Sequence, residues 1–152
     1  MDKKQIIFII SFILVFLFLP FLLKDKVVEF SKIKNIIDNK VNENFKKQDK
    51  NNIYKNTKIN ETLYEDYYSY ISSSYMEVDE VTVFKEKNPE NRKEIIRKLE
   101  NYILDKRNVF VGYGPDQVKM LDNNILKEKG EYVVLIILDD GKNLYNKLDR
   151  LF

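Results

Sequence analysis

Residues 132–138 have the sequence YVVLIIL, which is apolar at every position and decides the fold. Successive side chains of a strand point to opposite faces, so an unbroken apolar run predicts a strand with two buried faces. Such a strand is covered on both sides, or covered on one side and dimeric on the other. Residues 125–128 and the pair Lys129-Gly130 precede this run, with Glu131 between them and Tyr132. We therefore predict a hairpin whose second strand lies in the middle of a sheet.

Residues 64–86 carry the signals of a second hairpin. Aromatic and β-branched residues, which favour strands, stand on both sides of a polar stretch. That stretch contains three consecutive serines at 72–74 and an acidic segment at 77–80, and we expect the turn there. The strand residues are Tyr67, Tyr68, Tyr70, Ile71 and Tyr75 before the turn and Val78, Val81, Thr82, Val83 and Phe84 after it.

Three helices are expected around these hairpins. The longest has Asn88 as a cap and Pro89 at its first position, and it ends before Gly112. A short helix starts at Pro115, and Asp140 caps a final helix with an apolar stripe. The pattern predicts an α+β domain: an antiparallel sheet of about four strands in two hairpins, a long connecting helix, and helices before and after.

The N-terminal segment is strongly apolar. Residues 6–23 contain 16 apolar residues in 18, interrupted only by Ser11 and Pro20. At ~1.5 Å per residue, a helix of this length spans about 27 Å, close to the ~30 Å hydrocarbon core of a bilayer. The chain has no alanine, and residues 22–25 lack the small residues of a signal-peptide cleavage site. We therefore expect residues 1–26 to be a retained N-terminal transmembrane anchor, with the membrane as a partner through residues 6–23.

Residues 27–60 connect this anchor to the expected domain core in residues 61–152. Apolar residues recur at spacings of three and four from Val27 to Phe45, which predicts an amphipathic helix. Residues 46–60 have the composition of a polar connection rich in lysine and asparagine. A solvated loop is the first interpretation, and contact with anionic lipid head groups or acidic wall polymers is the alternative. The lysines are Lys46, Lys47, Lys50, Lys55 and Lys58.

The missing residue types exclude several kinds of chemistry. Without cysteine or histidine, the chain has no thiol nucleophile, disulfide, imidazole base, or zinc site with those ligands. After the first 23 residues, 24 basic and 23 acidic residues leave a net charge of +1, which argues against a nucleic-acid partner. We assign no catalytic residue, metal site or cofactor. An enzyme built from this sequence would depend on carboxylates.

Four features follow one another in an order that is typical of a known family. They are the acidic strand at 75–85, the helix after Pro89, the segment FVGYGPDQ at 110–117, and the closing strand at 130–138 with its helix. Over residues 31–148 the chain resembles a family of small bacterial proteins that carry a domain of unknown function. Members are secreted lipoproteins or membrane-anchored proteins, so the resemblance implies a single-pass protein of the cell membrane whose domain lies on the extracytoplasmic side. It implies no activity.

Glu80, Tyr113 and Gln117 are the candidate binding residues within that pattern. Each also has a structural alternative. Glu80 could be an exposed strand carboxylate or a cap for the nearby turn, and the other two could belong to a packed turn and a helix N-terminus. Gly112, Gly114 and Pro115 are expected to shape that turn, the glycines through unusual backbone angles.

We expect a non-enzymatic domain that binds an envelope component, such as a wall polymer, or an envelope protein. The first alternative is a carboxylate-dependent hydrolase in which Glu80 and either Asp116 or Asp79 converge in a cleft. The second alternative is a structural module that dimerises through an exposed face of the sheet. The sequence leaves the oligomeric state open.

Overall fold

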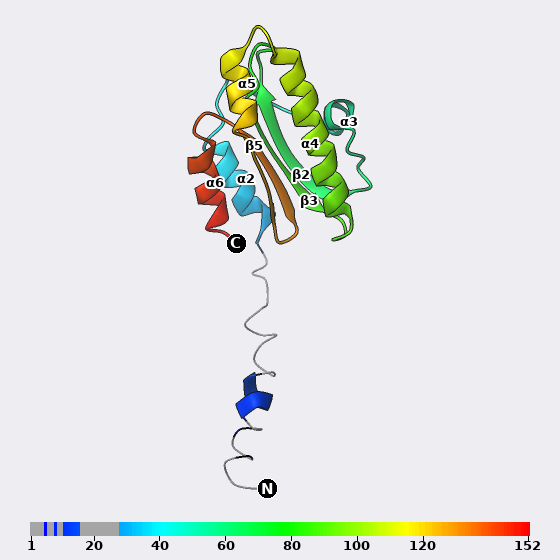
Figure 1. The fold of residues 1–152 in the computed structure, drawn as a ribbon, viewed down its shortest axis with the longest axis vertical. Helices are drawn as coiled ribbons and strands as arrows, with labels where there is room; N and C mark the ends of the chain where they lie inside the picture. Colours follow the sequence, from blue (N-terminus) through cyan, green and yellow to red (C-terminus); the bar gives the residue numbers. More distant parts are fainter. Residues whose placement is uncertain (1–4, 6–7, 9–10, 16–27) are drawn as a thin grey trace.

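The computed structural model of the chain describes residues 5, 8, 11–15 and 28–152, and Figure 1 shows their arrangement. From residue 30 onward the chain forms helices and strands in an irregular order. The elements are α2 (Phe30–Asp38), β1 (Phe45–Lys47), α3 (Lys50–Thr57), β2 (Tyr64–Ser72), β3 (Glu80–Glu86), α4 (Asn91–Phe110), α5 (Pro115–Asp122), β4 (Ile125–Lys129), β5 (Tyr132–Ile137) and α6 (Gly141–Asp149).

The strands form one antiparallel sheet in the order β1-β2-β3-β5-β4. β3 pairs with both β2 and β5, so the two predicted hairpins lie side by side in a single sheet. The α+β class is confirmed, but the prediction of about four strands is wrong because the sheet has five. The additional strand, β1, has only three residues and lies at the edge, paired with the end of β2. The sequence of β1 has no strand pattern, and its pairing with β2 stabilises the extended conformation.

The transmembrane helix predicted in residues 6–23 is not found. Across the residues that the structure describes, no helix combines the length and the apolar character needed to cross a bilayer. Of the predicted span, residues 8 and 11–15 are described, whereas residues 6–7, 9–10 and 16–23 lie outside the described residues. The prediction is based on hydropathy. Hydropathy measures how apolar a segment is, but it does not determine where a helix begins and ends.

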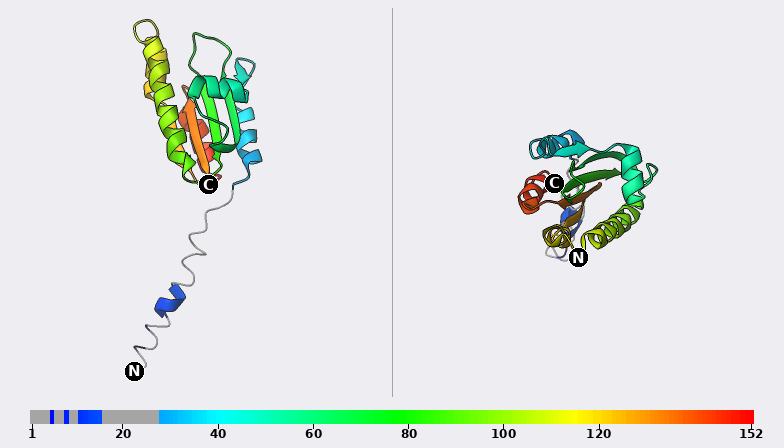
Figure 2. Two further views of the ribbon diagram at one scale, coloured as in Figure 1. Left: turned by 90° about the vertical axis from the view of Figure 1, so that its right-hand side faces the viewer. Right: turned by 90° about the horizontal axis from the view of Figure 1, so that it is seen from above.

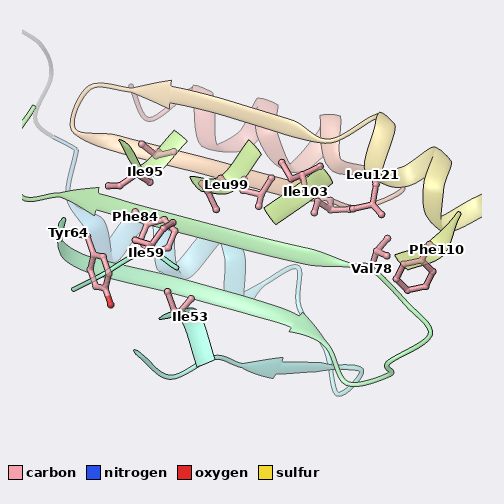
Figure 3. Close-up of a cluster of buried hydrophobic side chains, with 13 residues drawn as sticks. Ile53, Ile59, Tyr64, Val78, Phe84, Ile95, Leu99, Ile103, Phe110 and Leu121 are labelled. Atoms are coloured by element: carbon pink, nitrogen blue, oxygen red, sulfur yellow. The ribbon is translucent and has the colours of Figure 1, made fainter. Parts of the chain in front are cut away.

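Helices cover both faces of the sheet, as the view along its long axis shows (Figure 2). On one face, Ile95, Leu99 and Ile103 of α4 pack over Phe84 and Leu135 of the strands (Figure 3). On the other face, a second apolar cluster joins the strands to α2 and α6. Every residue of β5 is buried, as predicted for a strand that is covered on both sides. β5 therefore has no open face through which the chain could dimerise.

Two connections meet at the end of the domain opposite the C-terminus (Figure 1). They join β2 to β3 and α4 to α5, and Val78 from the first belongs to the same buried cluster as Phe110, the last residue of α4 (Figure 3). The backbone N–H of Val78 also donates to Gln117 Oε1 at 2.9 Å. The start of β3 is therefore fixed against the end of α4, where the site described next lies.

The start of α4 and the cap of α6 differ from the sequence prediction. α4 begins at Asn91 rather than at Pro89, after a turn in which the Asn91 N–H donates to the Asn88 carbonyl at 2.9 Å. Asp140 precedes α6, but its carboxylate accepts a hydrogen bond from Lys40 Nζ at 2.8 Å and none from the backbone of α6. An ion pair across the domain has thus replaced a local cap.

Candidate functional site

A row of buried polar side chains crosses the sheet beneath α3 and α4. Gln48 follows β1, Ser69 belongs to β2, and Thr82 and Glu80 belong to β3, and all four are buried. Ser69 and Thr82 are direct partners in the β2–β3 register. Glu80 points to the same face as Thr82 because residues two apart on a strand share a face. We call these four residues the polar row.

Each hydrogen bond along the polar row points toward Glu80. Asn56 Nδ2 donates to Gln48 Oε1 at 3.0 Å, and Gln48 Nε2 donates to Ser69 Oγ at 3.0 Å. Thr82 Oγ1 donates to Glu80 Oε1 at 2.9 Å and lies 2.7 Å from Ser69 Oγ. Because a hydroxyl has one proton, Ser69 must donate to Thr82. Bonds aligned in this way polarise one another and stabilise negative charge on the carboxylate.

Helix α4 supplies the positive charge that faces Glu80. Lys106 Nζ donates to Glu80 Oε2 at 3.1 Å, to the Tyr102 hydroxyl at 3.1 Å and to the Val78 carbonyl at 3.2 Å. These bonds use all three protons of the ammonium group. The Tyr102 hydroxyl donates to Glu80 Oε2 at 2.6 Å. Burial, followed by the neighbouring carboxylate, raises the pKa of Tyr102 well above its usual value.

Replacing Thr82 with valine is expected to lower the free energy of unfolding by about 1–3 kcal/mol. The substitution preserves the shape of the side chain but leaves the Ser69 hydroxyl without its acceptor and Glu80 Oε1 without its donor. Thr82→Ser is the control, because it keeps the hydroxyl and loses only a methyl group. Urea unfolding of the full chain measures both variants. A valine variant as stable as the serine variant would contradict a stabilising role for the polar row.

A cavity of about 420 Å³ opens beside the polar row, between α3 and the last turns of α4. Asn52, Lys55 and Asn56 of α3 line it, at the i, i+3 and i+4 positions that share one side of a helix. We call it the α3 cavity. The remaining lining residues are Lys46, Lys47, Gln48, Ile71, Ser72, Ser74, Tyr75, Glu77, Tyr102, Lys106 and Phe110.

Positive charge exceeds negative charge around the α3 cavity, where four lysines and one glutamate form the lining. Lys106 is held by Glu80, and the Lys47 ammonium lies 4.4 Å from the ring centroid of Tyr68, which belongs to the apolar cluster on the opposite face. Lys46, Lys47 and Lys55 form no ion pair within the described part of the chain. Since the Lys47 ammonium lies over a ring of the opposite face, Lys46 and Lys55 are the two lining charges that remain for the cavity without an ion-pair partner among the described residues.

The three candidate binding residues from the sequence have different surroundings in the structure. Glu80 is 0% exposed, so it is not a surface carboxylate, and it accepts from Thr82, Tyr102 and Lys106 rather than from the Gly-Tyr-Gly-Pro turn. Gln117 accepts the hydrogen bond from Val78, and Tyr113 is exposed with its ring centroid 5.5 Å from that of Phe110. Glu80, Tyr113 and Gln117 are all described, and none of them lines the α3 cavity. A direct role in binding stays a prediction for each.

The α4–α5 turn needs its two glycines for different reasons. Gly112 has a φ of 99°, in the region that favours glycine. Gly114 has a φ of −122°, which other residues adopt, but a Cβ there would lie only 2.8 Å from the ring of Phe110. Pro115 is the first residue of α5. A backbone N–H at this position has no hydrogen-bond partner within the helix, so proline loses nothing by lacking one.

The carboxylates of the hydrolase alternative do not share a cleft. Glu80 is buried in the polar row. Asp79 lines a separate cavity beside Lys40, and burial raises the pKa of Asp79. Asp116 lines another cavity beside Lys119. Among the residues that the structure describes, no three side chains that could hold a metal ion gather in one place.

Helix α3 is the part of the site that the sequence pattern does not reveal. The sequence predicts a polar connection over residues 46–60, whereas the structure places β1 and α3 there. The signal that could have identified the helix is weak: Ile53 and Thr57 are buried four residues apart, with Asn52 and Asn56 beside them. Asp49 adds a cap, because it accepts from the Asn52 N–H at 2.8 Å.

The comparison with protein families found one match. A family model described as Domain of unknown function (DUF4358) matches residues 38–138. The chain belongs to the DUF4358 family. The matched residues run from the end of α2 past β5, so the DUF4358 segment contains the whole polar row and the whole lining of the α3 cavity. No curated protein and no solved structure matches the DUF4358 chain.

Proposed function

We propose that the DUF4358 domain is a non-enzymatic binding module and that a negatively charged ligand binds in the α3 cavity. The observation that carries this proposal is the pair Lys46 and Lys55, which line the cavity and form no ion pair in the described chain. An anionic group in the cavity would accept charge-assisted hydrogen bonds from both lysines. The attraction is stronger than on an open surface because the cavity walls exclude part of the water.

The floor of the α3 cavity supports binding rather than proton transfer. Gln48, Tyr102 and Lys106 are held by hydrogen bonds within the fold, and the three protons of Lys106 are all in use. A general acid or base must be free to exchange a proton with its substrate. Fixed polar groups instead lower the entropy cost of binding, because the site is already ordered before the ligand arrives.

We further propose that the ligand is a component of the cell envelope. The support is the resemblance to secreted and membrane-anchored proteins, together with the positive charge of the α3 cavity. Protease treatment of intact cells tests the location that this requires. An extracytoplasmic domain is digested in intact cells, whereas a domain inside the cell is digested only after lysis.

Titration calorimetry of the full chain tests the binding site with three probes that share negative charge: a galacturonic acid trimer, a γ-glutamic acid trimer and triphosphate. The double substitution Lys46→Gln/Lys55→Gln is expected to weaken binding of the best probe by about tenfold or more. The matched control is Lys93→Gln/Lys147→Gln, which removes the same charge from exposed helix positions outside the cavity. Equal losses in both double variants, or no binding of any probe, would overturn the proposal.

A partner protein is the second candidate, and one observation favours it. Large apolar side chains are exposed on the last turn of α4 and on the two connections that meet at the end of the domain opposite the C-terminus (Figure 1). A photoreactive amino acid at position 113, followed by crosslinking in living cells, tests this candidate. A specific crosslinked protein supports it, and the absence of any crosslink argues against it. The exposed residues are Tyr75, Met76, Val109, Val111 and Tyr113.

A further inference from the structure

Tyr75 is the most exposed aromatic side chain at the α3 cavity. Its side chain lines the cavity, and the residue is 90% exposed. Lys46 Nζ lies 4.9 Å from the centroid of the Tyr75 ring. Lys46 is the register partner of Ile71, which also lines the cavity, so both point to the face that α3 covers. An aromatic face and a positive charge therefore stand together at the edge of one cavity.

The rest of the lining suits a ligand rich in hydroxyl groups. Asn52 and Asn56 carry amides, and Ser72 and Ser74 carry hydroxyls; Ser72 donates its proton to Glu77 Oε2 and Asn56 uses one amide proton on Gln48 Oε1, which leaves the other amide proton and the Ser74 hydroxyl to donate. These groups both donate and accept hydrogen bonds, which is what the hydroxyls of a sugar require. A volume of about 420 Å³ lies within the usual range of small-molecule sites, ~300–1,000 Å³. A sugar ring has apolar C–H faces and a polar edge, so it can stack on Tyr75 and bond to the amides at once.

Phosphate fits the lining less well than a carboxylate does. Phosphate sites commonly use free backbone N–H groups at a helix N-terminus or in a glycine-rich loop. The N-terminus of α3 is already capped by the carboxylate of Asp49, which accepts from the Asn52 N–H at 2.8 Å. None of the four glycines, all in the described part of the chain, lines the cavity. Glu77 also lies in the wall, where it would repel a doubly charged group more strongly than a single carboxylate.

We infer that the ligand of the α3 cavity is an acidic polysaccharide, with one sugar ring stacked on Tyr75 and its carboxylate paired with Lys46. The inference rests on the proposed function, since it names the chemical class of the negatively charged ligand. In this binding mode Tyr75 stacks on the ligand, whereas binding through the lysines alone would not involve Tyr75. A non-sugar polyanion would bind the lysines and leave the ring of Tyr75 unused.

The three probes separate charge from ring stacking. The galacturonic acid trimer offers carboxylates on sugar rings, the γ-glutamic acid trimer offers carboxylates without rings, and triphosphate offers charge alone. The full chain is expected to bind the galacturonic acid trimer at least about tenfold more tightly than the other two. Tyr75→Ala is expected to remove this preference, and Tyr75→Phe to retain most of it. Tyr54→Ala is the matched control, because Tyr54 is an exposed tyrosine of α3 that lines a different cavity.

Two outcomes distinguish failure of this inference from failure of the proposed function. If the γ-glutamic acid trimer or triphosphate binds as tightly as the galacturonic acid trimer, or Tyr75→Ala behaves like Tyr54→Ala, the sugar assignment is wrong. The proposed function survives that outcome as long as Lys46→Gln/Lys55→Gln still weakens binding. If none of the three probes binds, both proposals fail. Because Tyr75 is exposed, the thermal midpoint of the Tyr75 variants should match that of the wild type.

Discussion

Replacing Lys106 with methionine is expected to lower the free energy of unfolding by about 3–5 kcal/mol. Methionine keeps the apolar stem of the side chain but removes the charge that faces Glu80, which is 0% exposed. The carboxylate would then stay buried without its positive partner, and the Val78 carbonyl would lose the hydrogen bond from Lys106. Urea unfolding of the full chain, followed by circular dichroism, measures the loss.

Lys98 provides the matched control on the same helix. It lies eight residues before Lys106 and pairs with Glu94 one turn away, at 3.6 Å. Since the Glu94 side chain is 47% exposed and keeps its contact with water when Lys98 is replaced, Lys98→Met is expected to cost less than about 1 kcal/mol. Adding Glu80→Gln to the Lys106 variant should recover part of its loss, because a neutral amide needs no counter-charge. Equal losses at Lys98 and Lys106 would contradict the buried ion pair.

The strands and helices that the sequence predicts correctly are those with a strong local pattern. β5 has an unbroken apolar run, and the β4–β5 turn contains Lys129-Gly130, with Gly130 at a φ of 55°. α4 repeats its apolar residues at helical spacing over 20 residues. In each case the residues that define the element are also those that it buries. Local pattern and tertiary packing therefore favour the same structure.

The elements that the sequence does not predict depend on contacts between distant residues. Lys46 and Lys47 have no strand pattern, and β1 exists because the end of β2 offers free hydrogen-bonding groups. α3 buries only Ile53 and Thr57, which gives a weak periodic signal within a run of lysine and asparagine. The high asparagine content of this chain makes the helix harder to predict, because asparagine occurs in both its helices and its loops.

The buried environment of Glu80 could not be predicted from the sequence. Its choice as a candidate rested on its position in the acidic strand, which does not reveal whether the side chain is buried. The partners that explain its burial, Tyr102 and Lys106, lie 22 and 26 residues away. Their spacing of four places them on one side of a helix, but nothing in the sequence shows which strand that side faces. The polar row therefore becomes visible only in the folded structure.

Replacing Leu99 with alanine is expected to lower the free energy of unfolding by about 2–5 kcal/mol, whereas Leu104→Ala should change it by less than about 0.5 kcal/mol. Leu99 is 0% exposed and packs in the cluster that joins α4 to the sheet (Figure 3), and Leu104 is 54% exposed on the same helix. Alanine is the better helix former at both positions, so any loss reports packing and not helix propensity. Thermal and urea unfolding of the two variants give the comparison.

This pair of variants also tests which side of α4 faces the sheet, that is, the rotation of the helix about its own axis. The candidate site depends on this orientation. Tyr102 and Lys106 follow Leu99 by three and seven positions, so all three lie on one side of the helix. The rotation that buries Leu99 is therefore the rotation that directs Tyr102 and Lys106 toward Glu80. If Leu104→Ala cost as much as Leu99→Ala, α4 would have to present another side to the sheet. The hydrogen bonds to Glu80, and with them the floor of the α3 cavity, could not then form as described.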